Sequence, residues 1–199
     1  MKFKKKAIVC VSNDLVTDNR VAKTCQVLKE LDYHVYLVGR RKINSPEMNH
    51  REYKHKRLKL AFEKGPLFYM NLNVRLFLLL LFRKSDLIYS NDLDTLLPCY
   101  AVSRLRKVRL IYDTHELFTE VAELKSRPFV RNIWLTIEKW IFPRLQTVIT
   151  VNESIAKIYT DKYGVKVSSV RNVPLLVNNK QDVQSRIDLG IKDDDFIII

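Results

Sequence analysis

The chain has 199 residues, 47% hydrophobic and 29% charged, which fits one globular domain or one domain plus a fragment of a second. Its net charge of +13 favours anionic partners such as membranes, nucleic acid or polyphosphate ligands, although a solvated basic face explains the charge equally well. Three cysteines without metal-ligand spacing and only four glycines argue against a disulfide scaffold, a metal site and glycine-rich phosphate loops. With no secretory signal visible, we expect a reduced, cytoplasmic protein.

Short apolar runs alternate with segments of helical spacing along most of the chain. The predicted strands cover residues 7–11, 35–38, 87–89, 108–112, 147–151 and 167–170. The predicted helices cover residues 18–31, 65–82, 92–106, 128–142 and 153–163. The basic segment 40–60 reads as a loop and an outer strand. This alternation predicts an α/β fold with a doubly wound, mostly parallel Rossmann-like sheet flanked by helices.

The composition changes after Pro174. Residues 178–185 are polar and linker-like, residues 186–189 read as a short helix, and an apolar strand begins at residue 195 and stops at the chain end. We therefore expect one domain over residues 1–176. Residues 177–199 are expected to form a linker and the first strand of a truncated second domain.

Polar residues follow most of the predicted strands. Because parallel strands end at one edge of a sheet, these residues are expected to line a cleft. The polar strand ends are Ser12-Asn13-Asp14, Asn91-Asp92, Asp113-Thr114-His115-Glu116, Asn152-Glu153 and Arg171-Asn172.

The strongest catalytic candidate is His115, with Asp113 and Glu116 beside it. A histidine whose pKa lies near neutrality can donate to a phosphate or a sugar hydroxyl, or exchange a proton. The structural alternative is that Asp113 caps the following turn and His115 only packs.

The loop after the first strand offers Asn13, Asp14 and Arg20 where phosphate-binding proteins often have glycines. Such side chains suit a hydroxyl-rich ligand such as a sugar. The alternative is that these residues form a turn and a helix cap, with Arg20 paired to Asp14 or Asp18.

Two further polar pairs, Asn91-Asp92 and Asn152-Glu153, are good helix N-caps as well as candidate cleft residues. Nothing in the sequence singles out Asp94.

Five phrases in this order carry a resemblance to a known family. They are VSNDLVTDNRVAKTCQVLKELDYHVYLVGR, DLIYSNDLDTLLP, LIYDTHELFTE, TVITVNESIAKIYTDKYG and VRNVP. Together they resemble the amino-terminal half of family 4 (group 1) glycosyltransferases. The resemblance implies the GT-B architecture of two Rossmann-like domains. It also implies transfer of a sugar from a nucleotide-diphosphate donor, with retention of configuration and usually without a metal ion.

The resemblance also assigns roles to residues. His115 matches a histidine that hydrogen-bonds the transferred sugar, and the Asn13-Asp14 loop matches a segment that closes over the cleft, although it lacks the usual glycines. Asn152-Glu153 matches a polar turn at the cleft edge, and Arg171-Asn172 matches an interdomain hinge. From the polar strand ends and this resemblance together, the residues expected to contact substrate are Asn13, Asp14, Arg20, Asp92, Asp113, Glu116, Asn152 and Glu153.

The predicted function is therefore that of the acceptor-side domain of a retaining glycosyltransferase, inactive alone because the family's second domain holds most of the donor. The expected partners are a nucleotide-sugar donor and a saccharide or lipid-linked acceptor of glycan, capsule or lipopolysaccharide synthesis. No cofactor, metal ion or nucleic acid is expected. The basic, apolar-rich region 40–84 suits peripheral contact with the anionic inner face of the plasma membrane.

Two alternatives stay open at this point. A non-catalytic, basic α/β module that binds nucleic acid would use the same charged surface, although no nucleic-acid motif is present. A nucleotide-sugar epimerase is disfavoured because the chain lacks a Gly-x-Gly-x-x-Gly fingerprint.

Overall fold

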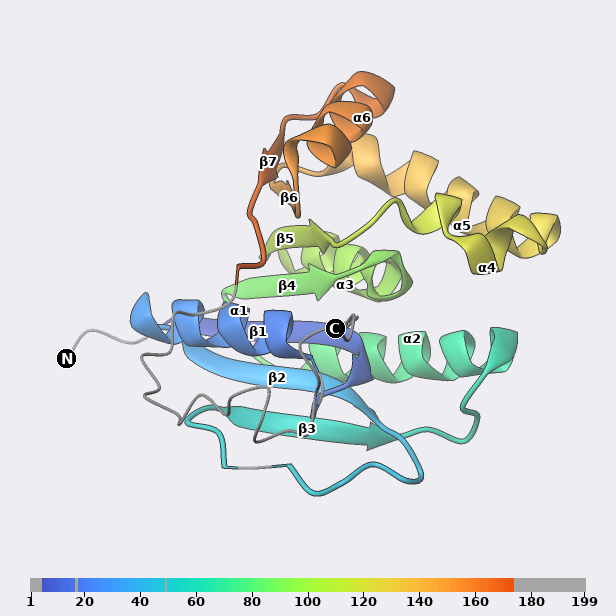
Figure 1. Ribbon diagram of the computed structural model, residues 1–199. Coiled ribbons are helices and arrows are strands. Elements are labelled where there is room, and N and C mark those ends of the chain that lie inside the picture. The colour runs from blue at the N-terminus through green and yellow to red at the C-terminus, as the bar shows by residue number, and fades with distance from the viewer. Residues whose placement is uncertain (1–4, 17, 49, 174–199) are drawn as a thin grey trace, which may run out of the picture.

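The computed structural model describes residues 5–16, 18–48 and 50–173. They form one seven-stranded sheet with all neighbouring strands parallel, in the order β3-β2-β1-β4-β5-β6-β7 (Figure 1). The strands are β1 Lys6–Asp14, β2 His34–Arg41, β3 Lys54–Lys59, β4 Leu87–Asn91, β5 Arg109–Thr114, β6 Val148–Thr150 and β7 Val167–Ser169. The predicted doubly wound Rossmann-like fold is confirmed.

The direction of strand addition reverses between β1 and β4. From β1 the chain proceeds to β2 and β3 at one edge, then returns to β4 on the other side of β1. In open α/β sheets a crevice forms at this reversal, outside the carboxyl ends of the strands. The fold therefore places any ligand site beyond the ends of β1 and β4.

Helices cover both faces of the sheet (Figure 1). They are α1 Asn19–Glu30, α2 Gly65–Phe82, α3 Leu93–Arg106, α4 Ala122–Lys125, α5 Pro128–Ile141 and α6 Glu153–Tyr163, with 3-10 turns η1 Phe118–Glu120 and η2 Phe142–Arg144. Side chains alternate along β1, so Val9 packs with α1 on one face and Ile8 packs with α2 on the other. The core thus has two layers of helices separated by the sheet.

Local signals in the sequence set several helix ends. The Asp18 side chain accepts the N–H of Val21 at the start of α1, and Asn152 accepts the N–H of Ile155 at the start of α6. Gly164, with φ +68°, ends α6 in the left-handed conformation. At α1 and α6 these caps explain why the predicted and observed helix ends agree to within one or two residues.

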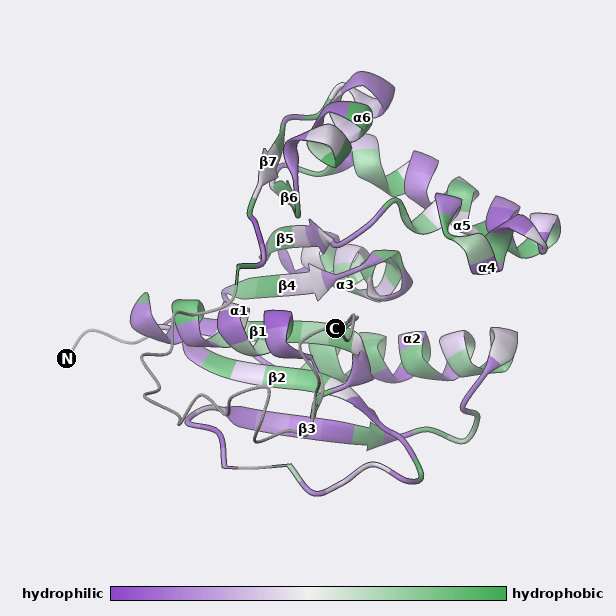
Figure 2. Cartoon of the chain, viewed as in Figure 1, coloured by the Kyte–Doolittle hydropathy of each residue, from purple (hydrophilic) through white to green (hydrophobic). Residues whose placement is uncertain are grey.

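The segment between β5 and α5 differs from the prediction. It contains η1 and α4, which have only three and four residues and therefore too few turns to show a period in the sequence. The predicted outer strand is β3, which lies at the sheet edge and is largely hydrophilic (Figure 2). The predicted domain boundary at residue 176, the linker, the short helix and the last strand all lie outside the described residues.

A close approach at Gly39 holds the loop that leaves β1. A Cβ atom at this position would lie 2.3 Å from Leu15 Cδ2 and 3.0 Å from the Asn13 carbonyl oxygen. We expect Gly39→Ala to lower the free energy of unfolding by about 1–3 kcal/mol, because the loop must move to make room. Urea unfolding of Leu15→Ala in both backgrounds supplies the control. If the clash is real, Leu15→Ala lowers the free energy of unfolding less in the Gly39→Ala background than in the wild type. Additive losses for the two substitutions would contradict the clash.

Candidate functional site

Three of the predicted site residues meet at the carboxyl ends of β4 and β5. These strands are neighbours, with Asn91 opposite Asp113, so Asp92 and His115 follow at the same edge of the sheet. Arg20, from the first turn of α1, reaches the same point across the strand reversal. The polar strand ends from which a cleft was predicted therefore bring His115, Asp92, Asp113 and Arg20 together as one cluster.

His115 lies between two carboxylates. Its Nδ1 is 3.2 Å from Asp92 Oδ2, and its backbone N–H donates to Asp92 Oδ1 at 3.1 Å. Its Nε2 is 3.6 Å from Asp113 Oδ2, which is too long for a hydrogen bond. Among the described residues this buried Nε2 has no hydrogen-bond partner, so it is a donor available to a ligand.

The two carboxylates decide the charge of His115. Burial alone lowers the pKa of the imidazole, but the close approach and negative charges of Asp113 and Asp92 outweigh it and raise the pKa to about 10. The expectation of a pKa near neutrality was wrong, because it took no account of both acids in three dimensions. At neutral pH the ring is protonated at both nitrogens, which makes it a hydrogen-bond donor and a fixed positive charge.

Asp92 adopts a backbone conformation that is rare for a residue with a side chain. Its φ is 61° and its ψ is 166°, a region occupied almost only by glycine. Its N–H donates to the Asp113 carbonyl oxygen at 2.9 Å, and its carboxylate serves His115 and does not cap α3. The capping alternative is therefore wrong for Asp92. Strain of this kind, of order 1–3 kcal/mol, clusters at functional sites.

Asp113 is 1% exposed and is bound from three sides. Arg20 makes a two-pronged contact, Nη2 to Oδ1 at 2.7 Å and Nε to Oδ2 at 3.2 Å, and the Tyr89 hydroxyl donates to Oδ2 at 2.9 Å. Burial raises the pKa of Asp113, but hydrogen bonds and charge from His115 and Arg20 exceed that effect and lower it. Asp113 thus stays ionised and holds Arg20, which does not pair with Asp14 or Asp18 as the alternative required.

Asp14 is turned away from this cluster. Its Oδ1 is 2.9 Å from Arg57 Nη2 of β3, and its Oδ2 accepts the Lys42 N–H at 3.1 Å. These contacts tie the end of β1 to the segment after β2. Its neighbour Asn13 is exposed and donates to Asp18 at 3.5 Å. The role of Arg57 had no signal in the sequence, where it is one cation within a basic run.

Asp94 is a buried carboxyl close enough to Asp92 to feel its charge, and the sequence did not single it out. It is buried in the first turn of α3, where burial first, and then the charge of Asp92, raise its pKa to about 7. Its Oδ1 has no hydrogen-bond partner among the described residues, and neither has Oδ1 of Asn91. The Asn91 amide nitrogen is used internally, donating to the Cys10 carbonyl at 2.9 Å. Around the ends of β4 and β5 there are thus one buried donor and two buried acceptors without hydrogen-bond partners among the described residues.

Three other predicted residues lie at the same edge, and none of them makes a side-chain hydrogen bond to His115 in the described structure. Glu116 is exposed, and burial, followed by the charges of Asp92 and Glu123, raises the pKa of its carboxyl. Asn152 acts as the N-cap of α6, and Glu153 is exposed in the first turn of that helix. Their substrate contacts stay predictions.

The predicted hinge follows β7 and is held by α1. Arg171 and Asn172 are exposed, and Lys23 Nζ donates to Asn172 Oδ1 at 3.0 Å and to the Val173 carbonyl at 2.7 Å. The hinge role stays a prediction. Within the described ranges, no group of three or more His, Cys, Asp or Glu side chains could hold a metal ion.

Comparison with protein families gives one match that covers most of the chain. The model of Glycosyltransferase Family 4 matches residues 17–180. No curated protein sequence matches the chain.

Several solved structures share the fold at low sequence identity. Sucrose-phosphate synthase from Thermosynechococcus elongatus is 18% identical, with a TM-score of 0.64 over 96% of this chain and 53% of that protein. UGT2 from Phytolacca americana, solved with UDP-2-fluoro-glucose and pterostilbene, is 10% identical, with a TM-score of 0.62 over 89% and 56%. UDP-GlcNAc 2-epimerase from Methanocaldococcus jannaschii is 15% identical, with a TM-score of 0.51 over 83% and 44%. The chain thus spans about half the length of these proteins, and the fold alone does not separate a transferase from an epimerase.

The buried ion pair of Arg20 and Asp113 leads to a prediction about stability. Arg20→Met leaves a buried carboxylate without its main partner, so we expect the free energy of unfolding to fall by about 3 kcal/mol. Lys157→Met is the matched control, because it breaks an exposed pair with Asp161 and should cost less than about 1 kcal/mol. Equal losses of unfolding free energy in the two variants, measured by urea unfolding, would show that Asp113 does not need the guanidinium.

The raised pKa of His115 makes stability depend on pH. The pKa is about 10 in the folded protein and about 6.5 in an unfolded chain, so the folded state binds the proton more tightly. The resulting stabilisation is complete below about pH 6.5 and is lost as pH rises towards 10. We expect unfolding free energy to fall more steeply from pH 7 to 9 in the wild type than in His115→Gln. His55→Gln, an exposed control, should keep the wild-type slope, and parallel curves for all three proteins would refute the assignment.

Proposed function

Since the chain belongs to Glycosyltransferase Family 4, we propose that the intact protein is a retaining glycosyltransferase. It moves a sugar from a nucleotide-diphosphate sugar to a saccharide or lipid-linked acceptor. The residues of this chain form the acceptor side of the cleft and contact the transferred sugar through His115.

The unpartnered Nε2 of His115 carries this proposal. It lies beyond the end of β5, next to the strand reversal where this fold class binds ligands, and it is buried with no hydrogen-bond partner among the described residues. A protonated imidazole fixed by Asp92 can donate a hydrogen bond to a sugar oxygen without moving. Its pKa of about 10 makes it a positioning donor and not a proton shuttle at neutral pH.

The two unpartnered acceptors in the cleft favour a ligand rich in hydroxyl groups. Each sugar hydroxyl both donates and accepts a hydrogen bond, so a sugar can receive a bond from His115 and give bonds to Asp94 and Asn91. An acyl chain, which has no hydrogen-bonding group, would leave these groups unsatisfied, which costs about 1–3 kcal/mol for each. We infer that the cleft is built for sugar hydroxyls.

The proposal also covers the second domain that the reaction needs and the place in the cell where it occurs. The chain covers 53% of sucrose-phosphate synthase and 56% of UGT2, which supports the inference that a second, donor-binding domain is required and that this chain is inactive alone. The net charge of +13 supports work at an anionic membrane, with the lipid-linked acceptor of glycan, capsule or lipopolysaccharide synthesis. We place the enzyme in the cytoplasm at the inner face of the plasma membrane, using no metal ion or other cofactor and binding no nucleic acid.

The two rival functions make different products. An epimerase returns an isomer of the nucleotide sugar and releases no free nucleotide diphosphate. A nucleic-acid-binding module shows salt-sensitive mobility shifts with duplex or single-stranded probes. Isomerisation of the nucleotide sugar and mobility shifts of nucleic-acid probes are therefore measured together with transferase activity.

The deciding experiment uses the protein extended beyond Ile199 and a panel of nucleotide sugars. We expect nucleotide diphosphate release with one donor, and a decrease of about 10²–10³-fold in His115→Ala because a fixed donor to the transferred sugar is lost. His55→Ala, which alters an exposed histidine of β3, should match the wild type. Equal release by His115→Ala would keep the enzyme and remove His115 from the mechanism. Isomerisation of the nucleotide sugar without release would replace the transferase with an epimerase.

A further inference from the structure

Helix α2 is apolar on two opposite sides. Phe68, Leu72, Leu76 and Leu80 are buried against the sheet. On the opposite side, residues four apart remain between 47% and 58% exposed, and these are Met70, Val74 and Leu78, with Leu67 continuing the row. A helix that only covers a sheet needs one apolar face, so the second face calls for a separate explanation.

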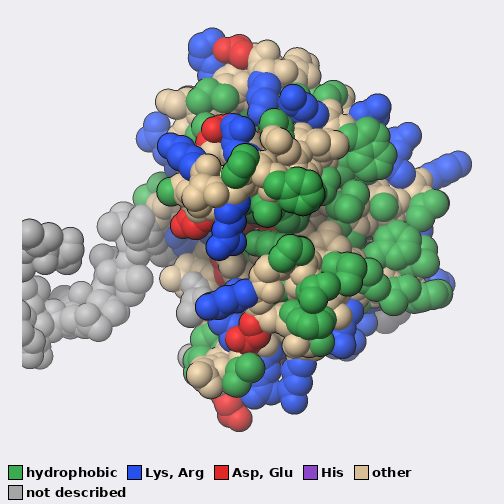
Figure 3. Space-filling view, turned by 90° about the vertical axis from the view of Figure 1, so that its right-hand side faces the viewer, with side chains coloured by type: hydrophobic (Ala, Val, Ile, Leu, Met, Phe, Trp, Pro, Cys, Tyr) green, Lys and Arg blue, Asp and Glu red, His purple; other side chains and the backbone are tan. Residues whose placement is uncertain are grey.

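The neighbouring helices extend this apolar surface. Leu105 of α3 is 66% exposed, and on α5 Phe129, Ile133 and Trp140 are exposed. Between α2 and α3 runs a groove of about 260 Å³, whose described lining is Asn73, Val74, Phe77, Leu78, Leu97, Pro98 and Ala101. Figure 3 shows the side where α2 and α5 begin, with apolar side chains over much of the surface and Lys and Arg around them. We call the outer face of α2, α3 and α5 the helix-layer face.

The charges of the helix-layer face have one sign. The three helices contain two acidic residues, Asp94 and Glu138, and both are buried. Their basic residues are Arg75, Arg104, Arg106, Arg131 and Lys139. A second copy of the chain would bring like charges together, whereas an anionic lipid surface complements them.

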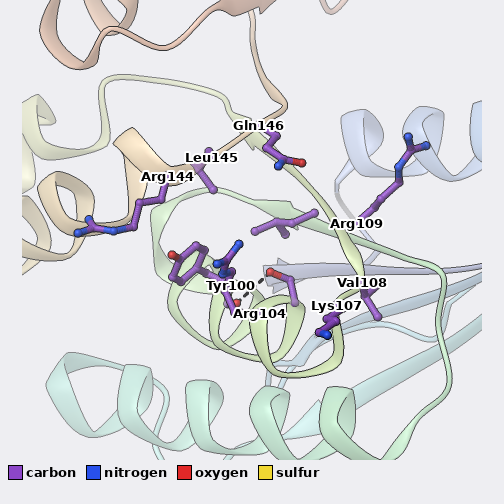
Figure 4. Close-up of a pocket in the computed structure, with 10 residues that line it drawn as sticks. Tyr100, Arg104, Lys107, Val108, Arg109, Arg144, Leu145 and Gln146 are labelled. Atoms are coloured by element: carbon purple, nitrogen blue, oxygen red, sulfur yellow. Dashed lines mark hydrogen bonds between the residues drawn. The ribbon is translucent and has the colours of Figure 1, made fainter.

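A basic pocket borders this face at the other end of α3. Its volume is about 410 Å³, and Arg104, Lys107, Arg109 and Arg144 are among its lining residues (Figure 4). None of the described residues that line it is acidic. Tyr100, also in the lining, packs edge-on against the exposed Trp140 at 5.8 Å. Aromatic rings beside cations suit the headgroup region of a bilayer.

We propose that the helix-layer face docks on the surface of an anionic bilayer, with α2 lying in the headgroup region. Of the helices that the structure describes, α2 alone is long and apolar enough to cross a membrane by length and composition. Spanning would pull Leu72, Leu76 and Leu80 out of the core, where each is 0% exposed, so α2 lies on the membrane. The inference narrows the expected contact region 40–84 to α2 and adds α3 and α5. Edge strand β3 carries positive charge, but its one large apolar side chain, Leu58, is buried and cannot contact a membrane.

The docked orientation suits the cleft. Leu67 and Phe129 are exposed near the starts of α2 and α5, at the same sheet edge as His115. If the proposed transferase function holds, a lipid-linked acceptor keeps its chain in the bilayer while its sugar reaches His115. Docking itself does not require transferase activity, so the two proposals can fail separately.

Co-sedimentation with vesicles tests the proposal, using the full chain and vesicles of phosphatidylglycerol or of phosphatidylcholine alone. We expect binding to phosphatidylglycerol vesicles at low salt that weakens at least tenfold at high salt, and little binding to phosphatidylcholine. Val74→Glu with Leu78→Glu should weaken binding by about tenfold or more. The matched control is Val27→Glu with Leu31→Glu on α1, which covers the opposite face of the sheet and exposes both residues. Circular dichroism confirms that each variant is folded.

A second pair of variants separates the two basic surfaces. Arg104→Glu with Lys139→Glu should weaken binding by about tenfold, whereas Lys54→Glu with Lys56→Glu on β3 should change it by less than about threefold. The proposal would be overturned if the wild type did not bind vesicles at low salt. It would also be overturned if the α2 variant bound as tightly as the wild type, or if only the β3 variant lost binding. If the wild type forms a dimer that Val74→Glu dissociates, and does not bind vesicles, the face is an interface between protein chains.

Discussion

The ion pair between Arg20 and Asp113 is the contact on which the cleft depends. It joins residues 93 positions apart, linking the start of α1 to the end of β5, and Arg20 also donates to the Val170 carbonyl at 3.1 Å. Three segments are thus fixed to one buried carboxylate, beside the strand reversal. Because Asp113 also lies next to His115 and lowers the energy of its protonated form, the pair sets both the shape and the charge of the site. A buried charge without such partners would destabilise the fold.

Three local costs lie close to this pair, although other described residues also have a positive φ or an unpartnered buried polar atom. Asp92 has a positive φ, Asp94 is a buried carboxyl with a raised pKa, and His115 keeps a buried nitrogen without a protein partner. Elsewhere the caps follow ordinary rules, as at Asn152 and Gly164. Folding alone gives no reason to gather three unfavourable features in one place. The surrounding sheet over-determines their geometry, and a ligand that completes the hydrogen bonds supplies the missing reason.

The fold followed from local information, and most of the site did not. The strands stand out as short apolar runs between segments of helical spacing, and their alternation leaves few topologies to choose from. Asp92, Asp113 and His115 were found because strand ends share one edge. The partner of Arg20, the Asp14–Arg57 contact and the importance of Asp94 depend on groups distant in sequence, and so does the charge of His115. Short elements such as α4 have no period to read.

The unusual composition of α2 follows from two constraints that act on opposite sides of one helix. One side must fill the space beneath the sheet with Leu72, Leu76 and Leu80, and the other exposes Met70, Val74 and Leu78. Solubility alone would place charged and polar residues on the second side. Helix α3 connects this surface to the cleft, since its first turn holds Asp94 and its last turn carries cations beside exposed Leu105. In the docking that we propose, contact at one end of α3 orients the groups at its other end relative to the bilayer, which would suit an acceptor anchored in a membrane.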